Sequence, residues 1–287
     1  MCDDDIHPGV PAAPAFSRRV FGLFTLAASL FGGAARAQSA VVEKDVRINT
    51  PDGLADAALF HPDSSGPWPS VLIWPDILSL RPVFREIGRA LAAEGYVVLI
   101  PNLYYRVKAA PVVDDSFNFA NPADRARLTP MRETVTPEGS ARDALSYLAF
   151  LDAQPETDAA RKTGTLGYCL GGPLAFQTAA AAPLRIGAVA SFHGAGLVDA
   201  TPDSPHRLIA ATKAEYLILI ADNDDQRDPA AKTTLSDTLK AANLAGQVEV
   251  FTGANHGWTV KGGQAYDPAA AHRAWTKLLA LYRRTLT

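Results

Sequence analysis

The chain has 287 residues, of which 48% are hydrophobic and 20% are charged, and its formal net charge is −3. This composition is typical of a globular protein and excludes a mainly disordered chain, which would combine low hydrophobicity with high net charge. The near-neutral balance and a pI near 6.1 also exclude the basic surface that binds nucleic acids, so no nucleic-acid partner is expected.

An export signal is predicted at the start of the chain. The pair Arg18-Arg19 precedes an apolar stretch from Val20 to Ala35, and Ala35-Arg36-Ala37 has the small-x-small pattern of a cleavage site. A basic segment, a short apolar core and such a tripeptide are typical of a secretory signal. The segment Ser17-Arg18-Arg19-Val20-Phe21 also resembles the twin-arginine motif, so export machinery is an expected partner.

Residues 1–37 are therefore predicted to be removed, leaving residues 38–287 as a periplasmic or secreted protein without stable membrane association. The alternative is a short N-terminal membrane anchor, although the apolar run is shorter than the roughly 20 residues that cross a bilayer comfortably. Cys2 would leave with the signal, so Cys169 would be the sole cysteine of the mature chain and no disulfide framework is possible.

The mature chain is predicted to be a single α/β domain. Segments 41–49 and 54–61 flank the turn Thr50-Pro51-Asp52-Gly53 and indicate an antiparallel hairpin. Short apolar runs of the buried-strand type then alternate with helical patterns. The strands are expected at 70–74, 96–100, 163–168, 186–192, 215–221 and 248–251, and the helices at 82–94, 139–151, 173–182, 229–245 and 268–286. This alternation predicts a mostly parallel sheet with helices on both faces.

The least regular stretch, residues 107–138, contains Pro111, Pro122, Pro130 and Pro137. We expect it to wrap the surface near the ligand site. Ligands of open α/β sheets bind at the carboxyl ends of the strands, so the functional residues should follow the predicted strands.

The sharpest sequence feature follows the strand at 163–168. Gly167-Tyr168-Cys169-Leu170-Gly171-Gly172 has the G-x-nucleophile-x-G pattern of a strained strand-to-helix turn, with Cys in the place of Ser. The helix start beneath the thiol would favour a thiolate, and the Leu170 N–H could stabilise a developing oxyanion. The alternative is a buried structural cysteine on a glycine-rich turn.

A nucleophilic thiol needs a base, and the base needs a group that orients it. His256 follows the last predicted strand in a glycine-flanked loop, which suits the chain order nucleophile, acid, histidine. His193, at the end of the strand after the nucleophile, is its main rival. The acid is expected after the strand at 215–221, where spacing alone does not choose among Asp222, Asp224 and Asp225; each could also be a turn or cap residue.

Four motifs together resemble the dienelactone hydrolase (carboxymethylenebutenolidase) family. They are, in chain order, Pro101-Asn102-Leu103-Tyr104-Tyr105-Arg106, Gly167-Tyr168-Cys169-Leu170-Gly171-Gly172, Asn223-Asp224-Asp225 and His256-Gly257-Trp258. The resemblance spans the chain from about Val41 to the C-terminus. It implies an α/β-hydrolase fold without a large cap, and a triad of Cys169, Asp224 and His256.

The resemblance also implies roles around the triad. Family members usually carry a His-Glu pair after the first parallel strand, where this chain has Pro75-Asp76. Asp76 would then be the carboxylate that contacts the thiol, and the Ile77 N–H would complete the oxyanion hole. Arg106 matches the family arginine that binds a substrate carboxylate, a role that suits a guanidinium fork; the alternative is a surface arginine after a strand.

The predicted function is hydrolysis of an ester or lactone, dienelactone-like and carboxylate-bearing, through a Cys169 thioester. Tyr105, Trp258 and His193 are candidate substrate-binding residues, although aromatic side chains near strand ends are as often core. No cofactor is expected, and no metal, because no C-x-x-C or H-x-x-x-H pattern occurs. The alternatives are a general carboxylesterase or peptidase for uncharged substrates, and a non-catalytic binding or stress protein on the same fold.

Overall fold

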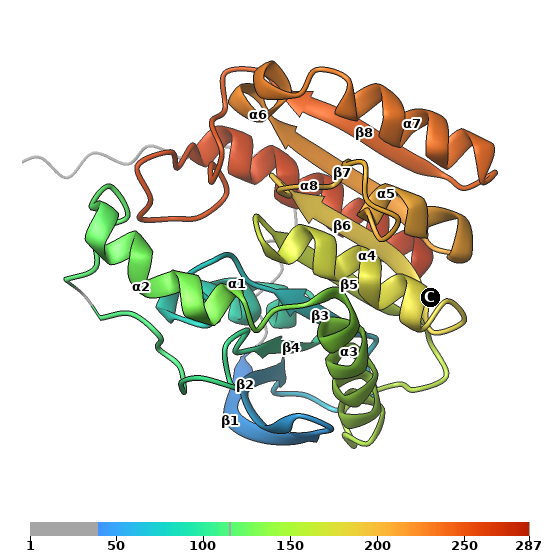
Figure 1. Cartoon of the computed structure of the whole chain (residues 1–287). Coiled ribbons are helices and arrows are strands. Elements are labelled where there is room, and N and C mark those ends of the chain that lie inside the picture. Colours follow the sequence, from blue (N-terminus) through green and yellow to red (C-terminus); the bar gives the residue numbers. More distant parts are fainter. Residues whose placement is uncertain (1–39, 115, 287) are drawn as a thin grey trace, which may run out of the picture. The chain divides into compact units, whose positions relative to one another are not determined.

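An eight-stranded sheet forms the centre of the computed structural model, which describes residues 40–114 and 116–286 (Figure 1). The strand order is β1-β2-β4-β3-β5-β6-β7-β8. β1 and β2 form an antiparallel hairpin, β2 pairs antiparallel with β4, and the remaining pairs are parallel. The strands are Val41–Thr50, Gly53–Pro62, Ser70–Trp74, Val97–Pro101, Thr163–Tyr168, Ile186–Phe192, Glu215–Ala221 and Gly246–Phe251, numbered β1 to β8.

Helices cover the sheet on both faces, as predicted. α1 (Pro82–Ala93) and α8 (Pro268–Thr285) pack on one face, while α3 (Pro137–Asp152), α4 (Gly171–Ala181) and α7 (Ala231–Ala241) pack on the other. Successive strand residues alternate between the two cores: Val71 and Ile73 of β3 belong to the first, and Leu72 and Trp74 to the second. Because side chains alternate along a strand, a strand that is covered on both faces is apolar throughout.

The segment between β4 and α3 departs from the prediction, because residues 122–132 form a helix, α2 (Pro122–Arg132). Its start has the signals of a helix N-terminus: Pro122 at the first turn, and an Asn121 side chain that accepts a hydrogen bond from the Ala123 N–H. The four prolines suggest an irregular segment, but a proline at the first turn of a helix favours that helix.

Several boundaries also differ from the prediction by a few residues. α4 begins at Gly171, directly after the Cys169 turn, and α7 ends at Ala241 because Asn243 has a positive φ of 54°. The acidic stretch after β7 is the short helix α6 (Asp222–Arg227) instead of an open loop. A further turn of α-helix, α5 (Pro205–Leu208), precedes the 3₁₀ turn Ile209–Ala211.

The predicted export signal, residues 1–37, lies outside the described residues. In the part of the chain that the structure describes, no helix is long and apolar enough to span a membrane.

Candidate active site

Cys169 lies on a tight turn between β5 and α4. Its φ is +52°, a left-handed conformation that is strained for a residue with a side chain. The turn fits only with glycine on either side: a Cβ on Gly167 would lie 2.0 Å from the Gly171 carbonyl oxygen, and one on Gly171 would lie 2.2 Å from the Trp74 carbonyl oxygen. Cys169 is a free cysteine and is half-buried.

Three backbone hydrogen bonds hold Cys169 in this conformation. Its N–H donates to the Phe192 carbonyl at 3.2 Å, and its own carbonyl accepts from the Gly172 and Ala195 N–H groups at 3.0 and 3.1 Å. The turn is therefore fixed to the end of β6 as well as to its own helix, which compensates for the strain at Cys169.

The loop after β8 brings His256 to Cys169, and α6 brings Asp224 to His256. His256 Nδ1 lies 2.5 Å from Asp224 Oδ2, and a side-chain hydrogen bond with Cys169 is among the causes that raise the pKa of this imidazole. β5, β7 and β8 are parallel, so the segments that follow them meet at one edge of the sheet (Figure 1). Cys169, Asp224 and His256, which are far apart in the chain, therefore lie at the same edge of the sheet.

Each residue of the acidic stretch has its own partner. The Asp222 carboxylate accepts from the Gly253 N–H and the Asn223 side chain from the His256 N–H, both at 2.8 Å, so these two residues hold the backbone of the histidine loop. Asp225 instead pairs with Lys232 at 2.7 Å. Sequence spacing does not choose among the three aspartates as the acid. In the structure, Asp224 is the one that contacts the imidazole.

The electrostatics of the site favour a charged His256. Burial lowers the pKa of His256, but the hydrogen bonds with Asp224 and Cys169 outweigh burial and raise it to about 10. The imidazole is therefore protonated at neutral pH, with the Asp224 carboxylate on one side and the Cys169 sulfur on the other.

Two backbone N–H groups that the sequence singled out, those of Leu170 and Ile77, have no acceptor among the described residues. Leu170 precedes α4, and the close packing of Gly171 on Trp74 brings this helix start against the loop that carries Ile77. The Asp76 carbonyl accepts from the Ser79 N–H at 2.8 Å, so the Ile77 N–H of the same peptide points away from that turn. The Tyr104 hydroxyl holds the loop by donating to the Ile77 carbonyl at 2.8 Å.

Asp76 differs from the expectation that it contacts the thiol. Its carboxylate accepts two hydrogen bonds from Arg81, at 2.6 and 2.8 Å, and one from the Leu78 N–H at 2.9 Å. Arg81 stands immediately before α1, where its planar fork matches both carboxylate oxygens. The Asp76 side chain is thereby directed to Arg81 and shapes the loop that carries Ile77.

Arg106 and Tyr105 were predicted to bind substrate, but their polar groups are already paired. Both Arg106 amino groups donate to the buried Asp143 carboxylate at 2.9 Å, and one also donates to Asp52 at 2.6 Å. The Tyr105 hydroxyl donates to the same Asp143 at 2.8 Å. A substrate carboxylate would have to displace Asp143, so this geometry corrects the substrate-binding assignment and favours a structural role.

Trp258 and His193 lie behind the imidazole of His256. Trp258 is fully buried and stacks on Phe251, with ring centroids 5.1 Å apart. The His193 ring lies 4.9 Å from that of His256, and its Nε2 is 2.8 Å from the Thr259 hydroxyl. Burial, together with the charge of His256, lowers the pKa of His193 well below its usual value, so it stays neutral. Both rings are buried: His193 packs on His256, and Trp258 packs on His193 and Phe251.

A cavity of about 180 Å³ borders the His256 and Asp224 side chains. Its apolar wall is formed by Leu197, Val198 and Ile220, and Arg227 and Asp228 stand beside them. Sequence reasoning missed these residues, although Arg227, three positions after Asp224, could have been noticed by its helical spacing. No cluster of three or more His, Cys, Asp or Glu side chains suited to a metal ion occurs within residues 40–114 and 116–286.

Comparison with known proteins extends the argument beyond the geometry. Residues 55–286 match the dienelactone hydrolase family. The chain belongs to this family. A protein of Escherichia coli K12 named as a candidate carboxymethylenebutenolidase is 26% identical over 77% of this chain and 79% of its own length. A Bradyrhizobium protein named as a 2-oxo-3-(5-oxofuran-2-ylidene)propanoate lactonase is 24% identical over 79% of this chain and 88% of its own length.

A crystal structure of a candidate dienelactone hydrolase from Klebsiella pneumoniae superimposes with a TM-score of 0.74 at 22% identity, covering 85% of this chain and 99% of that one. This likeness shows the fold. Membership of the dienelactone hydrolase family makes the chain an enzyme that hydrolyses esters or lactones, as the sequence predicted.

Proposed function

We propose that this dienelactone hydrolase family member hydrolyses its substrate by nucleophilic catalysis with Cys169, His256 and Asp224. The observation that supports the proposal is the arrangement of the three side chains. The thiol stands on a strained turn within hydrogen-bonding reach of an imidazole, whose other ring nitrogen lies 2.5 Å from a carboxylate. Acyl transfer needs these three parts: a nucleophile, a base and a group that orients the base.

In the first half-reaction the Cys169 sulfur attacks the carbonyl carbon of the ester or lactone. A C–S bond forms and the π electrons move to the carbonyl oxygen, whose negative charge the Leu170 and Ile77 N–H groups stabilise. The carbonyl then re-forms, the C–O bond to the alcohol breaks, and the leaving oxygen takes the proton of His256. The product is a thioester; with a lactone, the released hydroxyl stays attached to the acyl group.

In the second half-reaction water replaces the alcohol. His256, now neutral, takes a proton from water, and the hydroxide attacks the thioester carbonyl. The C–S bond breaks, the acid leaves, and the thiolate and imidazolium are restored. Asp224 keeps the imidazole in place and stabilises its charge in both halves.

The test is a comparison of Cys169→Ala with the parent. The variant should lose roughly 10³-fold or more in kcat, by analogy with other triad deletions. In the parent, a burst of p-nitrophenol from p-nitrophenyl acetate should coincide with one acetyl adduct on Cys169 in the intact mass. Cys2→Ala is the matched control and should keep full activity. A fully active Cys169→Ala protein would end the proposal.

The cavity beside His256 would accept the acyl group. With a volume of about 180 Å³ and walls of Leu197, Val198 and Ile220, it suits a short apolar group. For a carboxylate-bearing lactone the available cation in this cavity is Arg227, because Arg106 is paired with Asp143. The Arg227 side chain is 74% exposed, and among the described residues it forms one ion pair, with Asp224 at 3.3 Å.

A general carboxylesterase for uncharged substrates is the second candidate function. It is favoured by Asp228, which lies in the same cavity as Arg227 and would repel a substrate carboxylate. Hydrolysis of an acidic lactone and of a neutral p-nitrophenyl ester by Arg227→Ala separates the two candidates. If Arg227 binds a carboxylate, kcat/KM should fall about 10-fold or more for the acidic lactone alone. Equal effects on both substrates would favour the general esterase.

A further inference from the structure

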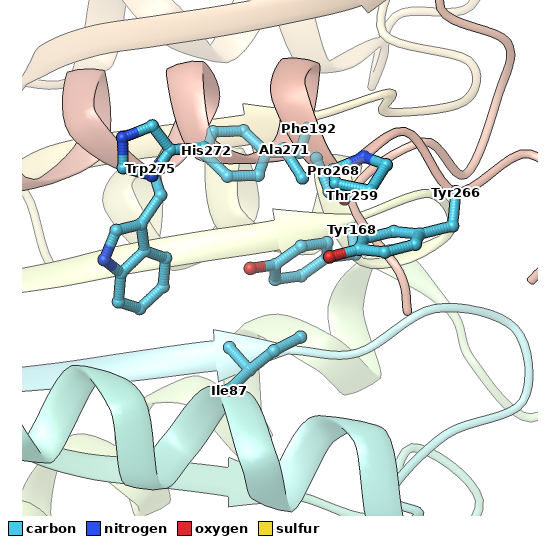
Figure 2. Close-up of a pocket in the computed structure, with 9 residues that line it drawn as sticks. All are labelled: Ile87, Tyr168, Phe192, Thr259, Tyr266, Pro268, Ala271, His272 and Trp275. Carbon is cyan, nitrogen blue, oxygen red and sulfur yellow. The ribbon is translucent and has the colours of Figure 1, made fainter. Parts of the chain in front are cut away.

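A second cavity lies between α1 and α8 (Figure 2). It is on the other side of the sheet from the cavity that borders His256 and Asp224. Its volume is about 260 Å³. Ile87 of α1 and Trp275 of α8 stand on opposite walls, Tyr168 and Phe192 come from the sheet, and Tyr266 comes from the loop before α8. We refer to this space as the α1–α8 cavity. Neither the triad nor the proposed acyl cavity uses it.

The Tyr168 hydroxyl is a hydrogen-bond donor that faces this cavity without a protein partner. The Tyr168 residue is only 2% exposed and its hydroxyl forms no hydrogen bond with any described residue, but the oxygen is not among the fully buried unpartnered atoms, so it is accessible from the cavity that Tyr168 lines. Figure 2 shows the hydroxyls of Tyr168 and Tyr266 pointing in the same direction between the two helices. Burial raises the pKa of Tyr168, so the hydroxyl keeps its proton and can donate it to a hydrogen bond.

The lining determines the chemistry of an occupant. Among the described residues, no Asp, Glu, Lys or Arg lines the α1–α8 cavity, and His272 is the one basic side chain there. A charged molecule would lose its hydration there without gaining an ion pair. The rings of Tyr168, Phe192, Tyr266 and Trp275 instead suit a flat apolar molecule. A cavity of roughly 150 Å³ already holds a benzene molecule, so about 260 Å³ has room for one or two rings.

We propose that the α1–α8 cavity binds a neutral aromatic molecule of one or two rings, which accepts a hydrogen bond from the Tyr168 hydroxyl. This site is distinct from the site of hydrolysis.

The α1–α8 cavity is also in contact with the residues that support the triad. Tyr168 directly precedes Cys169 in the chain. The hydroxyl of Thr259, which lines the cavity, lies 2.8 Å from His193 Nε2, and the His193 ring packs 4.9 Å from His256. A bound ligand would therefore bias the position of His256 and change the rate of hydrolysis. This effect on the rate rests on the proposed function, whereas binding itself does not.

Binding is tested with 4′-fluoroacetophenone, a neutral ring with a carbonyl acceptor and no ester bond, followed by its fluorine NMR signal. The Cys169→Ala protein is used, so that no chemistry at the thiol contributes. We expect saturable binding with a Kd on the order of 0.1–1 mM, typical of a ligand of this size. Tyr168→Phe keeps the ring but removes the donor, and should weaken binding about 5-fold.

A pair of variants on one helix locates the site. Ala271→Phe fills the cavity and should abolish binding, whereas Ala280→Phe adds the same ring at an exposed position of α8 and should leave binding unchanged. Ala271→Leu, a smaller filling, tests the same point should the larger variant unfold. No saturable binding, or equal binding to the folded Ala271 variants and the control, would overturn the proposal.

The effect on catalysis is read from the active protein with a neutral p-nitrophenyl ester. The probe should change kcat by at least 2-fold with little change in KM, and Ala271→Phe should remove this effect. Pure competition with the ester would overturn the assignment of a separate site. Full hydrolysis by Cys169→Ala would contradict the proposed function instead. The binding measurements would still decide whether the α1–α8 cavity binds the probe.

Discussion

At the scale of single residues, three of the four neighbours after β7 hold His256 or its loop, and the fourth binds elsewhere. Asp222 and Asn223 bind the backbone of the histidine loop, Asp224 binds the ring, and Asp225 binds Lys232. The short helix α6 makes this division possible, because successive residues of a helix point in different directions. Four similar polar side chains therefore have separable effects on catalysis.

Substitution of the three aspartates should separate these effects. Asp224→Asn should lower kcat by about 10²- to 10⁴-fold, because the imidazole loses its orienting charge. Asp222→Asn should have a smaller effect, since an amide oxygen can still accept from the Gly253 N–H. Asp225→Asn is the matched control on the same helix, and should change kcat by less than about 3-fold. Equal losses in steady-state kinetics of all three variants would contradict the assignment of Asp224.

The pair of His256 and Asp224 also predicts how stability depends on pH. The pKa of His256 is about 10 in the folded protein and about 6.5 in an unfolded chain. A group whose pKa is raised by folding stabilises the fold fully below its unfolded pKa, and this contribution is lost as pH rises through the folded value. The stabilising contribution should therefore decrease between about pH 6.5 and pH 10.

Thermal denaturation of the parent and Asp224→Asn across this range measures the effect. The difference in Tm between the two proteins should be largest near pH 6 and smallest above pH 10. Asp225→Asn, which removes a pair with a lysine, should show no comparable trend over the same range. A difference in Tm between parent and Asp224→Asn that grows with pH would contradict the raised pKa of His256.

At the scale of secondary-structure elements, Arg106 connects three segments. It lies after β4, binds Asp143 of α3, and reaches Asp52 in the turn between β1 and β2. The Asp143 side chain is 6% exposed, so its charge depends on Arg106 and on the Tyr105 hydroxyl. Removal of one partner of a buried ion pair leaves an uncompensated charge, which costs about 3–5 kcal/mol.

Arg106→Ala should therefore lower Tm by about 5–10 °C, and should reduce the hydrolysis of acidic and neutral substrates by similar factors. Arg106→Lys keeps the charge but loses the planar guanidinium group that pairs with both carboxylate oxygens. Its Tm should therefore lie between those of the parent and Arg106→Ala. Arg142→Ala is the control, because Arg142 also binds Asp52 but from an exposed position, where an ion pair contributes about 0–1 kcal/mol. An unchanged Tm with selective loss of acidic substrates would restore Arg106 to substrate binding.

At the scale of the whole chain, we propose that residues 1–37 direct the enzyme out of the cytoplasm by the twin-arginine route. The proposal rests on Ser17-Arg18-Arg19, the apolar run and the Ala35-Arg36-Ala37 tripeptide. The parent should yield a periplasmic product that begins at Gln38, and an Arg18→Lys, Arg19→Lys double variant should remain uncleaved in the cytoplasm. Fractionation and N-terminal sequencing measure both. Unchanged export of the double variant would exclude this route.

The sequence alone predicted the fold class, which the structure confirms, and it singled out Cys169, Asp224 and His256 as the candidate reacting residues. Alternating apolar runs and helical patterns predict a two-faced sheet, because a strand covered on both faces must be apolar throughout. The glycine pattern around Cys169 and the glycine-flanked His256 are local, since each depends on a turn formed by residues adjacent in the chain. The sequence therefore indicates both turns without knowledge of any contact between distant segments.

The tertiary structure decided which charged groups pair with one another. Arg106 has the same sequence context whether it faces a substrate or Asp143, and Asp76 has the same context whether it faces a thiol or Arg81. Asp224 differs from Asp222 and Asp225 only in the direction its side chain takes from α6. Ion pairs and cavities depend on segments far apart in the chain, such as Asp52 with Arg106 or α1 with α8, so the three-dimensional fold alone brings their partners together.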